Sequence, residues 1–140
     1  MCYMVFMDSK VDIEEVKRVV LSELSGEGGI AAIYLFGSVV DEYFNENSDI
    51  DVAILFKDEI SFERELDIGV KLERSLKRRV DLINLSRSDV IIAFEAVSKG
   101  VLIYEGDYIY HSDFLERLFR EYADVMPRYM RFMRELKESM

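Results

Sequence analysis

The sequence is poor in the residues that cross-link small proteins through disulfides or zinc. It contains one cysteine, Cys2, and one histidine, His111, among 140 residues. An internal disulfide needs two cysteines, and a zinc site built from Cys and His needs several such ligands, so both are excluded. The 28 Asp and Glu residues leave oxygen ligands as the available metal chemistry.

Long hydrophobic runs and a basic excess are also missing. A membrane-spanning helix needs about 20 apolar residues, and no run approaches that length. Residues 1–7 are apolar, but no basic region precedes them and Asp8 follows at once, so we do not expect a secretory signal. The net charge of −10 argues against direct binding to a nucleic-acid backbone. We expect a cytoplasmic protein with no membrane and no nucleic-acid partner.

With a single proline and half of its residues apolar, the chain is predicted to fold as one domain with a buried core. Apolar periodicity predicts an α/β (α+β) fold. The predicted strands span residues 30–36, 49–56, 80–85 and 101–104. The predicted helices span residues 13–24 after a capping box at 9–12, 62–79 after Ser61, 89–99 after Ser88, and 112–138, with a short helix or turn at 39–44. Pro127 predicts two helices, or one kinked helix, in the last segment.

Candidate catalytic and ligand-binding residues lie at the ends of the predicted strands. Gly37 and Ser38 end the first strand, Asp49 and Asp51 begin the second after a spacer of ten residues, and Asp81 lies near the start of the third. Side chains alternate along a strand, so Asp49 and Asp51 share one face. Each feature alone is more often a surface pair or a simple turn.

Together these residues fit metal-assisted phosphoryl or nucleotidyl transfer. That reaction uses two divalent cations about 3.5 to 4 Å apart, held by carboxylates. Carboxylates inside buried-strand patterns are costly unless they are paired or bind a metal. Glycine allows the backbone to approach a phosphate, and a helix beginning near Ser38 would favour an anion. We predict that Asp49, Asp51 and Asp81 bind metal and that Gly37 and Ser38 bind phosphate.

This pattern resembles the signature of the nucleotidyltransferases of the DNA polymerase β superfamily, in particular the minimal nucleotidyltransferases (MNT). The resemblance covers roughly residues 30–104, and the added C-terminal helical segment is similar to that of the MntA-type antitoxins, which are encoded beside HEPN toxins. It implies a nucleotidyltransferase fold, with a small mixed β-sheet, flanking helices and a C-terminal helical segment. It also implies ATP as cosubstrate, two Mg²⁺ ions, and a type VII toxin–antitoxin pair in which AMP is transferred onto a tyrosine of the HEPN toxin.

The resemblance also assigns roles by position. Gly37 and Ser38 would hold the β and γ phosphates. Asp49 and Asp51 would bind both metals, and Asp81 would bind the catalytic metal and help to activate the nucleophile, which makes these three aspartates the catalytic residues.

One departure from the family pattern keeps other functions open. Members often read Gly-Ser-x-Ala-Arg-Gly, whereas this chain has Asp41 and Glu42 at the last two positions. The missing cation favours an alternative in which a catalytically weak antitoxin neutralises its toxin by stoichiometric contact. A second alternative is a nucleotidyltransferase acting on a small molecule.

The C-terminal segment carries more apolar residues than a helix needs to pack on its own sheet. We divide the chain into a nucleotidyltransferase core, residues 1–107, and a C-terminal helical segment of the same domain, residues 108–140, as a partner interface. Contact there with the toxin or a second copy would make a hetero- or homo-oligomer, and truncation after Asp113 should abolish it. The apolar stripe comprises Leu115, Leu118, Phe119, Tyr122, Val125, Met126, Tyr129, Met130, Phe132, Met133, Leu136 and Met140.

Three further residue groups have simple structural interpretations. The cations at 77–79 either reach a phosphate or complement the end of a helix. His111 is expected at the surface or as a helix cap, and Tyr104 is expected in the core.

Overall fold

The computed structural model describes residues 12–40, 45 and 47–139. Cys2, Asp41, Glu42, Met140 and most of the predicted capping box lie outside the described residues. In chain order the elements are α2 (Ile13–Leu24), β1 (Ile30–Phe36), the 3₁₀ helix η1 (Gly37–Val40), β2 (Ile50–Phe56), α3 (Phe62–Leu76), β3 (Val80–Asn84), α4 (Val90–Lys99), β4 (Val101–Glu105) and α5 (Tyr108–Glu138).

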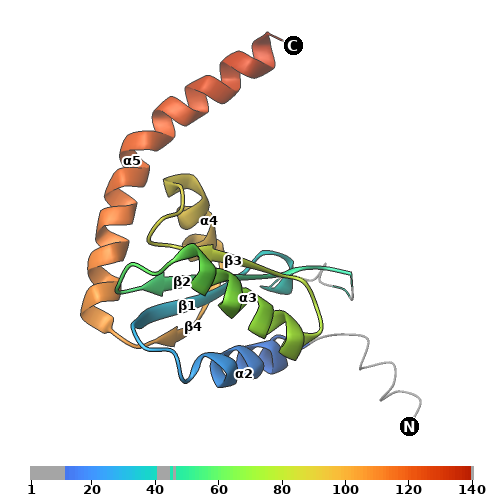
Figure 1. Ribbon diagram of the computed structural model, residues 1–140. Coiled ribbons are helices and arrows are strands. Elements are labelled where there is room, and N and C mark those ends of the chain that lie inside the picture. Colours follow the sequence, from blue (N-terminus) through green and yellow to red (C-terminus); the bar gives the residue numbers. More distant parts are fainter. Residues whose placement is uncertain (1–11, 41–44, 46, 140) are drawn as a thin grey trace.

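The four strands form one mixed sheet in the order β3-β2-β1-β4 (Figure 1). β1 pairs antiparallel with both β2 and β4, whereas β2 and β3 run parallel. The long crossover through α3 supplies the connection that a parallel pair requires. The predicted mixed sheet with flanking helices is therefore confirmed.

Helices cover both faces of the sheet. α2 and α3 pack on one face, where Val16, Val20, Ile68 and Leu72 join alternate residues of β1 and β2 in one apolar cluster. α4 and the first half of α5 pack on the other face. The cluster there consists of Ala31, Ala32, Tyr34, Ala53, Leu55, Leu85, Ala93, Ala96, Phe114 and Leu118. β1 and β2 are buried on both sides, which explains why each is an almost continuous apolar run.

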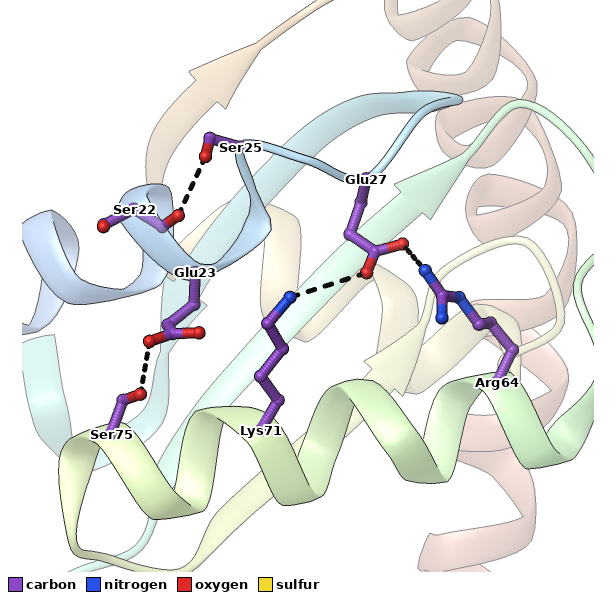
Figure 2. Close-up of polar contacts among 7 residues, drawn as sticks. All are labelled: Ser22, Glu23, Ser25, Glu27, Arg64, Lys71 and Ser75. Atoms are coloured by element: carbon purple, nitrogen blue, oxygen red, sulfur yellow. Dashed lines mark hydrogen bonds and ion pairs between the residues drawn. The ribbon is translucent and has the colours of Figure 1, made fainter.

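Polar contacts tie α3 to the end of α2 and the loop that follows it (Figure 2). Ser75 Oγ donates a hydrogen bond to Glu23 Oε1 at 2.5 Å. Glu27, with a side chain only 11% exposed, forms an ion pair with Arg64 and a longer one with Lys71 at 3.9 Å. These contacts fix the turn that leads into β1.

Several predicted boundaries shift. β2 begins at Ile50 rather than Asp49, because the ladder with β3 starts at the Ile50–Val80 pair. α3 ends at Leu76, since Lys77 takes a left-handed conformation with φ of 55°. α4 is capped by Asp89, which accepts a hydrogen bond from the Ile91 amide at 2.7 Å, and not by Ser88.

The predicted second helix, capped by Ser61, is confirmed at its start, where Ser61 Oγ accepts a hydrogen bond from the Arg64 amide at 3.1 Å. The fourth helix starts four residues earlier than predicted, at Tyr108, because Asp107 caps it. Its carboxylate accepts a hydrogen bond from the Tyr110 amide at 3.0 Å.

α5 is one helix that contains Pro127, and it changes direction along its C-terminal half as it leaves the body of the protein (Figure 1). Its first half is anchored, because Phe114 and Leu118 are buried and the Tyr122 ring stacks on Phe94 of α4 at 3.5 Å. Every described residue from Pro127 onward is exposed. Truncation after Asp113 would remove two buried side chains, Phe114 and Leu118, whereas truncation after Met126 would keep both.

No helix in residues 12–40, 45 and 47–139 combines the length and the apolar character that crossing a membrane requires.

Candidate active site

The sheet brings the second and third predicted carboxylates side by side. Asp51 of β2 lies opposite Asp81 of β3 in the parallel ladder. Ala53 and Leu55, which alternate with Asp51, pack on the side of α4 and α5, so both aspartates face that side of the sheet. This neighbouring position could not be derived from the spacing of 30 residues alone.

Gly37 lies directly against Asp51. Phe36, the last residue of β1, is the antiparallel partner of Asp51, and the turn into η1 begins at the next residue. Gly37 has a φ of 75°, and a Cβ atom added there would overlap the Asp51 carboxylate oxygen Oδ2. Only glycine therefore fits both the backbone conformation and the space beside the carboxylate.

The position of Asp51 is unfavourable for a negative charge. Partial burial, together with the negative charges of Asp81 and then Asp49, raises the pKa of the Asp51 carboxyl to about 6. The negative charges of both neighbours therefore act on the Asp51 carboxyl. A site of this kind favours a bound cation, because a positive ion offsets the repulsion between the acids.

Asp49 precedes β2 and is exposed, but the chain that leads to it is fastened. Arg78 Nη1 donates hydrogen bonds to the carbonyl oxygens of Asn45 at 2.7 Å and Ser48 at 3.0 Å. The predicted cations at 77–79 thus divide their roles: Lys77 ends α3 and Arg78 holds the segment before Asp49.

The donor set fits a hard divalent cation in its chemistry. Three carboxylates with a shared negative potential are the ligands that Mg²⁺ prefers. Within the described part of the chain, no three Asp, Glu, His or Cys side chains already form a cluster tight enough to hold a metal. The assignment of Asp49, Asp51 and Asp81 as metal ligands remains a prediction supported by register and charge.

Ser38 occupies the first turn of η1, which has four residues, rather than the start of a long helix. Together with Gly37 it lines an open cavity of about 570 Å³. The other lining residues are Phe36, Val40, Ile92, Glu95 and Lys99. The two predicted phosphate-binding residues therefore face space that a ligand can enter.

A buried hydrogen-bonded chain lies on the same side of the sheet as the aspartates. Tyr34 Oη lies 2.6 Å from His111 Nε2, and His111 Nδ1 lies 2.5 Å from Glu105 Oε2. Burial and the charge of Glu105 raise the pKa of Tyr34 to about 12, so its hydroxyl stays protonated and can donate to His111. The expectation that His111 lies at the surface or caps a helix was wrong, since it is 3% exposed.

Tyr104 also differs from its prediction. It is 42% exposed, because β4 is an edge strand and most of its residues lie at the surface. Residues 101–104 are all apolar, so the sequence has no alternation that would mark an exposed face, whereas the structure exposes every residue of β4 except Ile103.

The chain belongs to the family described as Polymerase beta, Nucleotidyltransferase, whose model matches residues 19–109. The match contains all five predicted site residues and confirms the family that they indicated.

One curated protein aligns with part of this chain. The chain is 34% identical over 68 residues to the protein adenylyltransferase MntA of Shewanella oneidensis, and the aligned region covers 49% of this chain and 49% of that protein. The chain thus aligns with about half the length of this curated relative.

Two solved structures share the fold. One is a chain in a crystal structure of a toxin–antitoxin complex with AMP-PNP, with a TM-score of 0.77, 22% identity, and coverage of 86% of this chain and 98% of that one. The other belongs to a complex of tri-AMPylated Shewanella oneidensis HEPN toxin with an MNT antitoxin, with a TM-score of 0.73, 21% identity, and coverage of 89% and 98%. At these identities the likeness shows the fold.

Proposed function

We propose that this protein is an Mg²⁺-dependent adenylyltransferase that transfers AMP from ATP to a tyrosine of a HEPN toxin and so acts as its antitoxin. The observation that carries the proposal is the contact of Gly37 with Asp51, with Asp81 in register on the next strand. This arrangement joins a backbone turn suited to phosphate with the carboxylates that nucleotidyl transfer needs. The relative named as a protein adenylyltransferase supports the choice of reaction.

The residues of the site have defined parts in this proposal. Gly37 and Ser38 would hold the β and γ phosphates, and Asp49, Asp51 and Asp81 would hold Mg²⁺, which supplies charge neutralisation at the phosphates when bound. The acceptor hydroxyl oxygen attacks the α-phosphorus, and the bond from that phosphorus to the bridging oxygen breaks. Pyrophosphate leaves with the bonding electron pair, and the hydroxyl proton passes to Asp81.

Labelled ATP tests the proposal. The purified protein is incubated with α-labelled ATP, Mg²⁺ and the HEPN protein encoded beside it, and wild type is compared with Asp49→Ala/Asp51→Ala. We expect label on the toxin with wild type only, and none with a toxin whose acceptor tyrosine is phenylalanine. Absence of label on the toxin with wild-type protein, under conditions where both proteins are folded, would overturn the proposal.

A second candidate is neutralisation by contact alone, with little turnover. The observation that favours it is the projecting half of α5, where five large apolar side chains are between 38% and 57% exposed. These residues are Tyr129, Met130, Phe132, Met133 and Leu136. Twelve helical residues from Pro127 to Glu138 extend roughly 18 Å, enough to lie along a partner helix. Methionine-rich helical faces adapt readily to such partners.

Truncation after Met126 separates the two candidates. Because Phe114 and Leu118 remain, we expect the shortened protein to keep its fold and its transition temperature within a few degrees. Contact alone would be favoured by two results together. The Asp49→Ala/Asp51→Ala protein would still neutralise the toxin, and the truncated protein would neither bind nor neutralise it. A truncated protein that binds the toxin as wild type does would eliminate α5 as the docking segment.

A further inference from the structure

The open cavity beside Gly37 and Ser38 has one wall that the proposed chemistry has not used. That wall belongs to α4, which contributes Ile92, Glu95 and Lys99. Among the described residues that line this cavity, Lys99 is the only cation. The opposite wall is the turn that we assign to the polyphosphate tail of the nucleotide.

The position of Lys99 is set by close packing at the next residue. A Cβ atom added at Gly100 would lie 2.8 Å from the Leu35 carbonyl oxygen and 3.1 Å from Phe36 Cβ. The end of α4 is therefore pressed against the end of β1, one residue before Gly37. The backbone next to Lys99 thus lies against the residue that precedes the proposed phosphate turn.

The ammonium group of Lys99 is held by a neighbour that also lines the cavity. Lys99 Nζ donates a hydrogen bond to Glu95 Oε1 at 2.9 Å, one helical turn away. A lysine is charged at neutral pH, and the hydrogen bond to Glu95 raises the pKa of Lys99 further. The pair is exposed, and exposed pairs of this spacing contribute little to stability, which leaves Lys99 free to exchange its partner.

We propose that Lys99 leaves Glu95 when a nucleotide binds and contacts the polyphosphate tail across the cavity from Gly37 and Ser38. This inference rests on the proposed nucleotidyl transfer. It identifies Lys99 as the positively charged side chain that contacts the pyrophosphate leaving group. The protein has a net charge of −10, and the first charged residues after Ser38 are Asp41 and Glu42, so a positively charged side chain for the phosphates has to come from another element. Glu95 holds Lys99 in place and competes with phosphate for it.

The test uses an unusually well matched control in α5. Arg120 forms an ion pair with Glu116 at 2.9 Å and the same spacing, and both side chains are highly exposed. ATP, inorganic tripolyphosphate and AMP are titrated by calorimetry in Mg²⁺ buffer against wild type, Lys99→Gln, Lys99→Arg, Glu95→Gln and Arg120→Gln. Circular dichroism confirms that each variant is folded.

We expect Lys99→Gln to weaken ATP and tripolyphosphate about tenfold, as for loss of one charged hydrogen bond, and AMP less than about twofold. Lys99→Arg should stay near wild type, Glu95→Gln should bind polyphosphate as well as or better than wild type, and Arg120→Gln should change nothing. If wild type binds ATP and Lys99→Gln matches Arg120→Gln, the role of Lys99 is refuted while the nucleotidyl transfer stands. If wild type binds neither ATP nor tripolyphosphate, both proposals fall.

Discussion

Replacing Asp51 with asparagine should stabilise the folded protein at neutral pH in the absence of divalent metal. Asp51 is partly buried beside Asp81 and Asp49, and its pKa rises from 3.8 to about 6 on folding. A raised carboxyl pKa means that the charged form is less favourable in the folded state than in the unfolded chain. Asparagine keeps the shape of the side chain and removes that charge.

The size and the pH dependence of the effect follow from this shift. About two pKa units correspond to a ceiling of about 3 kcal/mol, and because Asp51 is partly exposed to solvent we expect roughly 1 kcal/mol after screening. For a chain of this length that is an increase of about 3 to 5 °C in transition temperature. The penalty is absent only well below pH 3.8, where Asp51 is protonated in both states. It grows as the pH rises from about 3.8 to about 6, and it is nearly constant at higher pH, where Asp51 is ionised in both states.

The assay is thermal unfolding followed by circular dichroism at pH 4, 5, 6, 7 and 8 in EDTA, with wild type and Asp51→Asn side by side. Asp67→Asn, an exposed substitution on α3, serves as the control and should behave as wild type at every pH. Adding millimolar Mg²⁺ at pH 7 should raise the transition temperature of wild type more than that of Asp51→Asn, since a ligand stabilises the state that binds it. A variant that is less stable than wild type at pH 7, or a difference that does not change between pH 4 and 8, would refute the reasoning.

Two further predictions concern neighbouring contacts. Gly37→Ala should destabilise the protein by about 1 to 3 kcal/mol, because the residue has a positive φ and the added Cβ atom overlaps Asp51, and it should reduce AMP transfer more than tenfold. In an Asp51→Ala background, the loss of stability measured by denaturation should fall to about 1 kcal/mol. Equal losses in both backgrounds would contradict the overlap. Tyr34→Phe leaves His111 Nε2 without its partner and should cost about 1 to 3 kcal/mol in urea denaturation, whereas exposed Tyr108→Phe should cost almost nothing. A Tyr34→Phe protein as stable as Tyr108→Phe would show that the buried chain is not a stabilising contact.

Local patterns in the sequence predicted most of the secondary structure, because the apolar residues recur at regular spacing and capping residues mark the starts of the helices. The stretch Ile30–Phe36 is apolar at nearly every position, and it forms the central strand β1, which is buried on both faces. Where two capping residues are adjacent, as at Ser88 and Asp89, the sequence does not say which one caps the helix. The start of α5 was missed because Tyr108 and Ile109 are exposed and do not follow the apolar stripe.

Local sequence patterns could not predict contacts between segments that are distant in the sequence. His111 carries no neighbouring signal of burial, and its partner Tyr34 is 77 residues away. Its burial depends on a hydrogen bond at each ring nitrogen, one to β1 and one to β4. A lone histidine in a sequence cannot reveal two partners that only the completed sheet supplies.

Gly37 illustrates how the structure adds to the meaning of a residue that the sequence singles out. The sequence suggested that its small size lets the backbone approach phosphate. The structure adds that the absent side chain leaves room for the Asp51 carboxylate, whose Oδ2 occupies the space that a Cβ atom would fill. The same glycine thus places the proposed phosphate turn directly against the Asp51 carboxylate. The proposed phosphate and metal sites can be adjacent only because β1 ends where β2 begins in the antiparallel pair, at Phe36 and Asp51.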